Sequence, residues 1–178
     1  MIELYDRYSQ ESRDLHESLV STGLSQLGVV IDADGFLPDG LVSPFTYYLG
    51  YEKGKPLYFN QVPVPAFWEI SGNNQSARIE DMTQERALIH YADGMQARLV
   101  KQVDWKDLEG RVRQVDHYNR FGACFATTTF SADSEPVMTV YQDVNGQEVL
   151  LENHVTGDIL LTLPSQSMRY FANKVEFI

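Results

Sequence analysis

The chain of 178 residues holds 14 basic and 25 acidic residues, which gives a formal net charge of −11. Proteins that bind nucleic acids gather Lys and Arg against the phosphates, so this excess of acid argues against a nucleic-acid partner. The hydrophobic fraction of 43% is large enough for a buried core. The length predicts one domain, or one domain and a fragment of another.

Cysteine content and apolar runs indicate where the protein works. Cys124 is the single cysteine, so no disulfide can form within the chain, which favours a reducing compartment. The first residues lack the basic and apolar regions of a signal peptide, and aliphatic runs such as Ile159–Leu161 are much shorter than a membrane span. We therefore expect a soluble, cytoplasmic protein.

The N-terminal segment has the pattern of an α/β unit. Ser9 is a good N-cap for a helix over residues 10–20, and Gly23 lies just beyond its last turn. The unbroken apolar run Gly28–Ile31 then suits a buried parallel strand. A helix that leads into such a strand is half of an α/β unit. We expect residues 1–35 to open a Rossmann-like layer whose completion lies outside this chain.

From residue 45 onward the sequence is typical of short β-strands. In Gln75–Glu80, apolar Ala77 and Ile79 alternate with polar residues, as expected when one strand face is buried. Turn signals such as Asp93-Gly94 and Asn145-Gly146 separate similar segments. The segments predict a mainly β fold, an extended antiparallel meander without helices. Further strands are predicted at Tyr47–Glu52, Leu57–Asn60, Phe67–Ser71, Glu85–Tyr91, Ala97–Val103, Val112–Tyr118, Cys124–Phe130, Val137–Gln142, Glu148–Glu152, Asp158–Thr162, Met168–Phe171 and Val175–Ile178.

No residue pattern predicts a catalytic, cofactor-binding or metal-binding site. Asp32–Gly35 resembles the start of a calcium loop, but the required glycine and glutamate are absent at the sixth and twelfth positions. Asp116 and His117 are neighbours on a strand and should point to opposite faces. Cys124 lies among strand residues, which favours a small core residue over a nucleophile. Four histidines without metal-like spacing are interpreted as surface or core residues: His16, His90, His117 and His154.

Charged and aromatic residues leave two questions open. Residues 98–120 contain six basic and four acidic residues, whereas residues 121–168 contain six acidic residues and no Lys or Arg. This asymmetry is typical of solvated strand faces, and alternatively of a polarised sheet that steers a partner. Trp68, Trp105 and Tyr118 are either core residues or the stacking platform of a carbohydrate-binding or YD-repeat module.

Motifs throughout the chain resemble the N-terminal part of one family, the glycosyltransferase-stabilising proteins of the accessory Sec system. None of these motifs is a catalytic signature, and the resemblance rests on their order and density. They are Glu11-Ser12, Asp14–His16, Ser18-Leu19, Asp34–Pro38, Ser43-Pro44, Pro56–Gln61, Val64-Pro65, Trp68, Ile89–Tyr91, Val103–Trp105, Asp116–Asn119, Gly146–Leu150 and Thr156–Leu161.

The resemblance implies a GT-B glycosyltransferase-like architecture with an extended β-sheet domain inserted into the first Rossmann-like lobe. Residues 1–40 would open that lobe, and residues 41–178 would form the β-sheet domain. The implied function is that of a non-catalytic subunit, a co-chaperone that needs no cofactor. It would bind a catalytic O-GlcNAc transferase and its serine-rich-repeat adhesin, and lie at the inner face of the cell membrane. No site residue transfers from the family to this chain.

Partner binding would follow from the exposed edges of such a sheet. Two homologous sheets can join edge to edge through main-chain hydrogen bonds, and the same edges allow self-association. One alternative is the sheet insertion of an active GT-B glycosyltransferase, which the second lobe would reveal. The other is the carbohydrate-binding or YD-repeat module, which would need aromatic side chains on one wet face.

Overall fold

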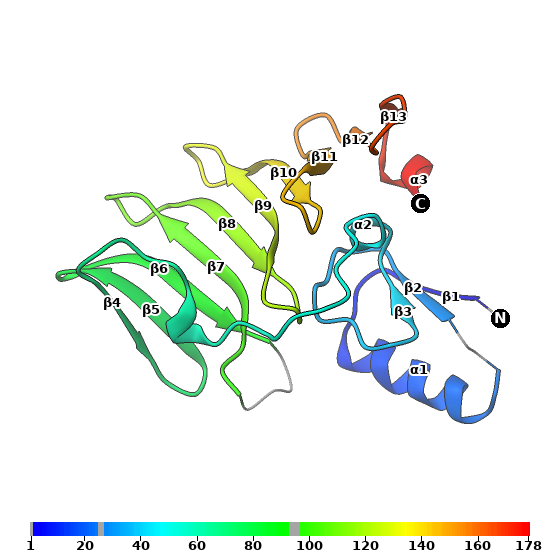
Figure 1. The fold of residues 1–178 in the computed structure, drawn as a ribbon, viewed down its shortest axis with the longest axis horizontal. Coiled ribbons are helices and arrows are strands. Elements are labelled where there is room, and N and C mark those ends of the chain that lie inside the picture. The colour runs from blue at the N-terminus through cyan, green and yellow to red at the C-terminus, as the bar shows by residue number, and fades with distance from the viewer. Residues whose placement is uncertain (1, 25–26, 93–96) are drawn as a thin grey trace.

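The structure is a computed structural model that describes residues 2–24, 27–92 and 97–178. It contains a three-stranded sheet and an antiparallel sheet of ten strands (Figure 1). The large sheet dominates the molecule, and the small one lies beside its C-terminal strands. The predicted fold class is confirmed: an antiparallel meander follows a short Rossmann-like α/β fragment.

The small sheet contains parallel strands in the order β1-β2-β3. Helix α1 contacts this sheet through buried His16, whose Nδ1 lies 2.9 Å from Glu3 Oε2. Ser9 caps α1, because its hydroxyl accepts a hydrogen bond from the Ser12 amide. The helix and the following strand are therefore present as predicted, while the division after residue 40 stays a prediction. The elements are β1 (Ile2–Tyr5), α1 (Gln10–Ser21), β2 (Leu27–Val30) and β3 (Leu41–Val42).

The large sheet is a meander, in which each strand pairs with the strands before and after it in sequence. Buried and exposed residues alternate along these strands, which explains why the alternation of apolar and polar residues in the sequence predicted most of them. The strands are β4 (Trp68–Gly72), β5 (Ser76–Asp81), β6 (Gln84–Tyr91), β7 (Val100–Lys106), β8 (Val112–Tyr118), β9 (Cys124–Phe130), β10 (Pro136–Gln142), β11 (Glu148–Asn153), β12 (Ile159–Leu161) and β13 (Arg169–Phe171).

Two predicted strands are absent from the structure, and capping residues start a helical turn at or near each of them. Within the predicted strand Tyr47–Glu52, Tyr47 ends helix α2 (Pro44–Tyr47), which Ser43 caps through its side chain and Pro44 opens. The predicted strand Val175–Ile178 is mostly α3 (Lys174–Phe177). Here the Asn173 side chain accepts a hydrogen bond from the Glu176 amide.

Two further strand predictions are wrong in extent. The predicted strand Leu57–Asn60 makes one isolated bridge, from Tyr58 to Leu99, and then enters the 3-10 turn η1 (Phe59–Gln61). The strand predicted at Ala97–Val103 begins at Val100 and continues to Lys106. The predicted turn Asp93-Gly94 lies outside the described residues.

The hydrophobic core changes sides along the sheet. Cross-strand register places Ile89, Val103, Asp116, Thr127, Val140, Leu151 and Leu160 in one row, which defines the first face. On the second face, the corresponding row holds His90, Gln102, His117, Ala126, Tyr141, Leu150 and Leu161.

One cluster, which includes Val62, occupies the first face near β4–β8, and Leu57, Phe59 and Val64 pack against it. A second cluster occupies the second face near β9–β12, where it includes Phe45 from α2 and contacts Phe177 from α3. Each half of the sheet therefore has one covered and one more exposed face.

Contacts between the small unit and the large sheet are direct. The Lys101 Nζ lies 3.0 Å from Asp34 Oδ2, and the Arg120 amide donates to the Gly35 carbonyl at 2.9 Å. Lys101 is an extra residue at a β-bulge, because Gln102 pairs with His90 while Val100 pairs with Tyr91. A Cβ on Gly35 would lie 2.5 Å from the Tyr118 carbonyl oxygen, so only glycine permits this close approach.

Within the described part of the chain, no helix has both the length and the apolar character needed to span a membrane.

Candidate partner-binding surface

Two histidines and two threonines form one hydrogen-bonded chain on the second face. His117 Nε2 lies 3.0 Å from Thr128 Oγ1, which is 2.8 Å from Thr139 Oγ1, and this atom is 2.7 Å from His154 Nε2. Both threonines are buried. Burial lowers the pKa of His117 below its ordinary value. The chain joins neighbouring strands of the sheet and takes up the side-chain hydrogen-bonding groups of both threonines, so we interpret it as structural.

The other polar residues considered as candidate ligands also contact side chains or backbone of the same chain. His90 Nε2 lies 2.7 Å from Asp104 Oδ2 across β6 and β7. Asp32 lies 3.3 Å from Lys174 Nζ, and Asp34 caps a turn by accepting the Phe36 amide. Among the described residues, no group of three His, Cys, Asp or Glu side chains is arranged to hold a metal ion.

Asp116, His117 and Cys124 do not form a reactive cluster. Asp116 accepts hydrogen bonds from Trp105 Nε1 at 2.7 Å and from Thr127 Oγ1 at 3.1 Å, on the face opposite His117. Burial raises the pKa of the Cys124 thiol to about 11, so the nucleophilic thiolate is scarce near neutral pH.

The aromatic residues favour the core interpretation over a stacking platform. Tyr118 is buried, and Trp68 and Trp105 pack against the first-face cluster. The Arg86 guanidinium lies over the Trp68 ring, 5.2 Å from its centroid, so this ring face is not free to stack on a sugar.

Five of the six basic residues of segment 98–120 pair with nearby acids. Solvated ion pairs of this kind each contribute little stability. The pairs are Lys101–Asp34, Lys106–Glu85, Arg111–Asp107, Arg113–Asp107 and Arg120–Asp39, while Arg98 Nη2 donates to Asn74 Oδ1.

Strand β4 is one free edge of the large sheet and lies at the end farthest from the small unit (Figure 1). Asn73 donates its amide to Ser76 within the β4–β5 turn. The β4–β5 register has no shift, so alternation directs the amides of Ile70 and Gly72 away from β5. These outward amides are available to a strand from another chain. The opposite edge, β13, has only three residues and is followed at once by α3.

Two exposed apolar side chains flank the β4 edge. Phe67 precedes β4 and is 98% exposed, and Met82 lies in the β5–β6 turn and is 92% exposed. Trp68 pairs with Asp81, so the two residues lie at the same end of this strand pair. Both have positive φ, 71° for Phe67 and 55° for Met82, a backbone conformation that is uncommon for large side chains. Strained, exposed apolar residues beside a free edge indicate a docking site.

The C-terminal strands carry a second apolar surface on the first face. Val140, Leu151, Leu160 and Tyr170 pair successively across β10–β13. The first three are half-buried, and Tyr170 is exposed. We call these four residues the C-terminal stripe; in the same register row, polar Asp116 and Thr127 separate the stripe from the core residues of β6 and β7.

Comparisons with known proteins find relatives over the whole chain. The GtfB N-terminal domain matches residues 2–48, and the GtfB middle domain matches residues 68–172. A GtfB from Streptococcus pneumoniae TIGR4, named as a stabilising protein of a UDP-N-acetylglucosamine–peptide N-acetylglucosaminyltransferase, is 91% identical over 178 residues. These residues are the whole of this chain and 40% of that protein, so the chain spans less than half of this curated relative.

Solved structures show the same relationship. A chain in the crystal structure of a GtfA/B complex bound to UDP and GlcNAc has 52% sequence identity and a TM-score of 0.94 over 99% of this chain and 40% of that one. The pneumococcal O-GlcNAc transferase GtfA, at 12% identity, shares the fold alone, with a TM-score of 0.63 over 99% of this chain and 39% of that one. With the middle-domain match spanning more than half of its length, the chain belongs to the GtfB family.

Proposed function

We propose that this chain is the partner-binding part of a non-catalytic subunit that stabilises a peptide O-GlcNAc transferase. The β4 edge carries the proposal, because it combines two outward amides with the exposed side chains of Phe67 and Met82. The transferase GtfA shares the fold of this chain, extended sheet included. Two sheets of one type can join edge to edge through main-chain hydrogen bonds, so the catalytic subunit is the partner we assign to β4.

The choice between a stabilising subunit and an active transferase rests on the relatives. The fold alone does not separate the two, because a transferase shares it. The relatives at high identity are named stabilising proteins, which supports the non-catalytic assignment.

The proposal extends to the whole protein in three respects. Residues 1–40 open a Rossmann-like lobe, and residues 41–178 form the sheet domain that carries the partner edge. The complex works in the cytoplasm, at the inner face of the membrane. Its acceptor is a serine-rich-repeat adhesin polypeptide. The family resemblance supports each of these assignments.

A pair of substitutions at one position tests edge docking. Ile70→Ala removes first-face packing but keeps the outward amide, whereas Ile70→Pro also removes that amide. We expect the full-length Ile70→Pro protein to bind the catalytic subunit at least about tenfold more weakly than Ile70→Ala, the value of one to two hydrogen bonds and a disrupted edge. Binding is measured by calorimetry, with thermal unfolding followed in parallel. Equal affinity of the two variants at similar stability would contradict docking at β4.

A further inference from the structure

The hydrogen-bonded chain on the second face connects a partly buried histidine to an exposed one. His117 of β8 is its inner end, His154 of the β11–β12 turn is its outer end, and Thr128 and Thr139 lie between them. The three contacts measure 3.0 Å, 2.8 Å and 2.7 Å from the inner end to the outer end. Both threonines are buried, whereas His154 is exposed to water. The chain therefore links a solvent-accessible imidazole to one within the sheet.

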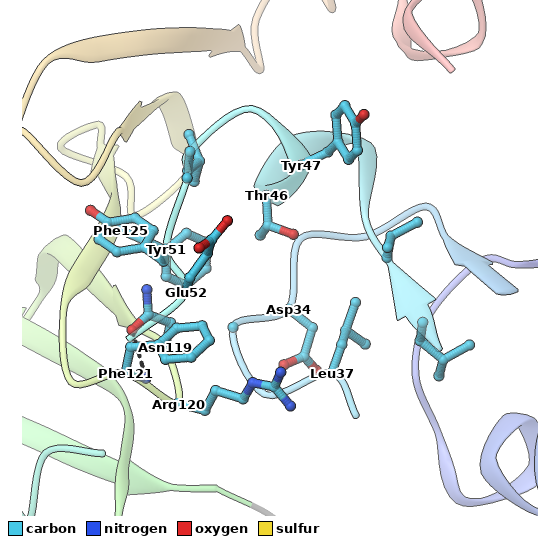
Figure 2. A pocket seen from close by; sticks show the side chains of 15 residues that line it. Asp34, Leu37, Thr46, Tyr47, Tyr51, Glu52, Asn119, Arg120, Phe121 and Phe125 are labelled. Carbon is cyan, nitrogen blue, oxygen red and sulfur yellow. Dashed lines mark hydrogen bonds between the residues drawn. The ribbon is translucent and has the colours of Figure 1, made fainter. Parts of the chain in front are cut away.

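The inner end of the chain lies close to the junction with the small unit. The ring centroids of His117 and Phe125 are 6.4 Å apart. Phe125 belongs to the second-face cluster with Phe45 of α2, and it also lines the pocket between the large sheet and the loop after β2 (Figure 2). Hydrogen bonding at His117 is thus adjacent to the packing that joins the two parts of the molecule.

The number of hydrogens in the chain limits how its two ends can be protonated. Three contacts need three hydrogens, and the two hydroxyls supply two of them. If neither Nε2 atom carried a hydrogen, one contact would lack one. If both carried a hydrogen, one hydroxyl would have no acceptor in the chain, and these hydroxyls make no other hydrogen bond within the described residues. An unpaired donor at a buried position is costly, so the chain favours one Nε2 hydrogen at a time.

Charged groups near each end act on the two rings separately. Burial is the largest influence on the pKa of His117 and lowers it, while two carboxylates raise it and one lysine lowers it. On the outer side, Glu152 pairs with Thr139 across β10 and β11 and lies 3.7 Å from a lysine Nζ. The charged groups are Asp104, Asp116 and Lys101 on the side of His117, and Glu152, Lys174 and Asp158 on the side of His154.

We propose that this chain is a pH-sensitive switch, in which a proton on exposed His154 sets the hydrogen-bonding state of His117. Charged His154 donates from Nε2 to Thr139, Thr139 donates to Thr128, and Thr128 donates to Nε2 of His117. His117 is then neutral, with its hydrogen on Nδ1. A further proton from solvent must bind the accepting Nε2 of His117, so that one buried hydroxyl loses its acceptor. The doubly charged state therefore loosens the second face where β8, β9 and β10 meet.

Correlation NMR of the imidazole nitrogens in the full-length protein tests the proposal. At a pH above the titration of both rings, one of the two histidines should carry its hydrogen on Nε2 and the other on Nδ1. Once acidification has charged His154, neutral His117 should be in the Nδ1–H form. Two neutral rings with the hydrogen on the same nitrogen would overturn the proposal.

Substitution of the outer histidine measures the coupling between the rings. His154→Ala leaves the Thr139 hydroxyl free to turn toward water, so the proton affinity of His117 should rise about twofold to tenfold, the value of one hydrogen bond. In a Thr139→Val background the chain is already broken, and His154→Ala should leave the proton affinity of His117 unchanged. The matched control is Val155→Ala, an exposed neighbour of His154, which should change nothing.

The two backgrounds distinguish a hydrogen-bonded switch from simple repulsion between charges. An equal effect of His154→Ala with and without the Thr139 hydroxyl would mean that the rings interact only through their charges, and it would overturn the switch. Unchanged titration of His117 in the single variant would do the same. These measurements involve no catalytic subunit, so their outcome is independent of the proposed function.

Discussion

Phe67→Gly should strengthen the fold and weaken partner binding at the same time. Phe67 occupies the third position of the turn Pro65–Trp68, which the Trp68 amide closes by donating to the Pro65 carbonyl at 3.3 Å. Its φ of 71° is the conformation that a type II turn requires of this position, where glycine is favoured. The left-handed conformation costs a non-glycine residue about 1–2 kcal/mol.

The two effects can be estimated separately. The Phe67 side chain is 98% exposed, so its removal costs almost no packing in the isolated protein. After a deduction of roughly 0.5–1 kcal/mol for the greater freedom of glycine in the unfolded chain, a net gain of about 0–1.5 kcal/mol in the free energy of unfolding remains. If the partner buries this side chain, binding loses about 1.5–3 kcal/mol, which is roughly a tenfold to hundredfold loss of affinity.

The assays are urea unfolding of the free protein and calorimetric binding to the catalytic subunit. Met82→Gly is a companion variant, because Met82 also combines exposure with positive φ. Lower stability of Phe67→Gly together with unchanged affinity would refute the reasoning, since it would mean that the side chain serves the fold and not the partner.

Three further substitutions test the interior of the molecule. Gly35→Ala places a Cβ 2.5 Å from the Tyr118 carbonyl oxygen and should lower the unfolding free energy, measured in urea, by about 1–3 kcal/mol. The control Gly110→Ala meets open space, so it should lower the unfolding free energy by only about 1 kcal/mol, because of its positive φ. Thr139→Val breaks the buried chain of hydrogen bonds and should lower the unfolding free energy by about 1 kcal/mol. The control Thr129→Val, at an exposed position, should leave it nearly unchanged. Equal effects of the two substitutions would contradict a stabilising role of the chain. Burial lowers the pKa of His117, so the unfolded state binds more protons than the folded state just below pH 6.5. The free energy of unfolding should therefore fall as the pH drops through this window, and it should fall less in His117→Gln. An identical pH profile of the two proteins would contradict the argument.

Local patterns were sufficient for most strands of the sheet. Val112–Tyr118 and Cys124–Phe130 were predicted with the bounds that the structure gives, because alternating burial is visible in the sequence itself. The strand predicted at Tyr47–Glu52 was wrong. Its aromatic residues favour strands, but Ser43 and Pro44 begin helix α2, which ends at Tyr47, and residues 48–52 continue as a turn and an irregular segment.

The candidate sites depended on contacts that a single sequence does not reveal. Alternation predicts that one strand face is buried but not which side is covered, so the change of the core from the first face to the second was not predictable. The positive φ of Phe67 also has no sequence signal, since type II turns favour glycine at this position.

Amide hydrogen exchange of the full-length protein, with and without the catalytic subunit, tests edge docking most directly. Ile70 and Gly72 point their amides away from β5 and should exchange rapidly in the free protein. In the complex, we predict strong protection of these two amides and little change at Tyr170 in β13. Protection confined to the C-terminal stripe or to β13, with Ile70 and Gly72 still exchanging freely, would contradict docking through the β4 edge.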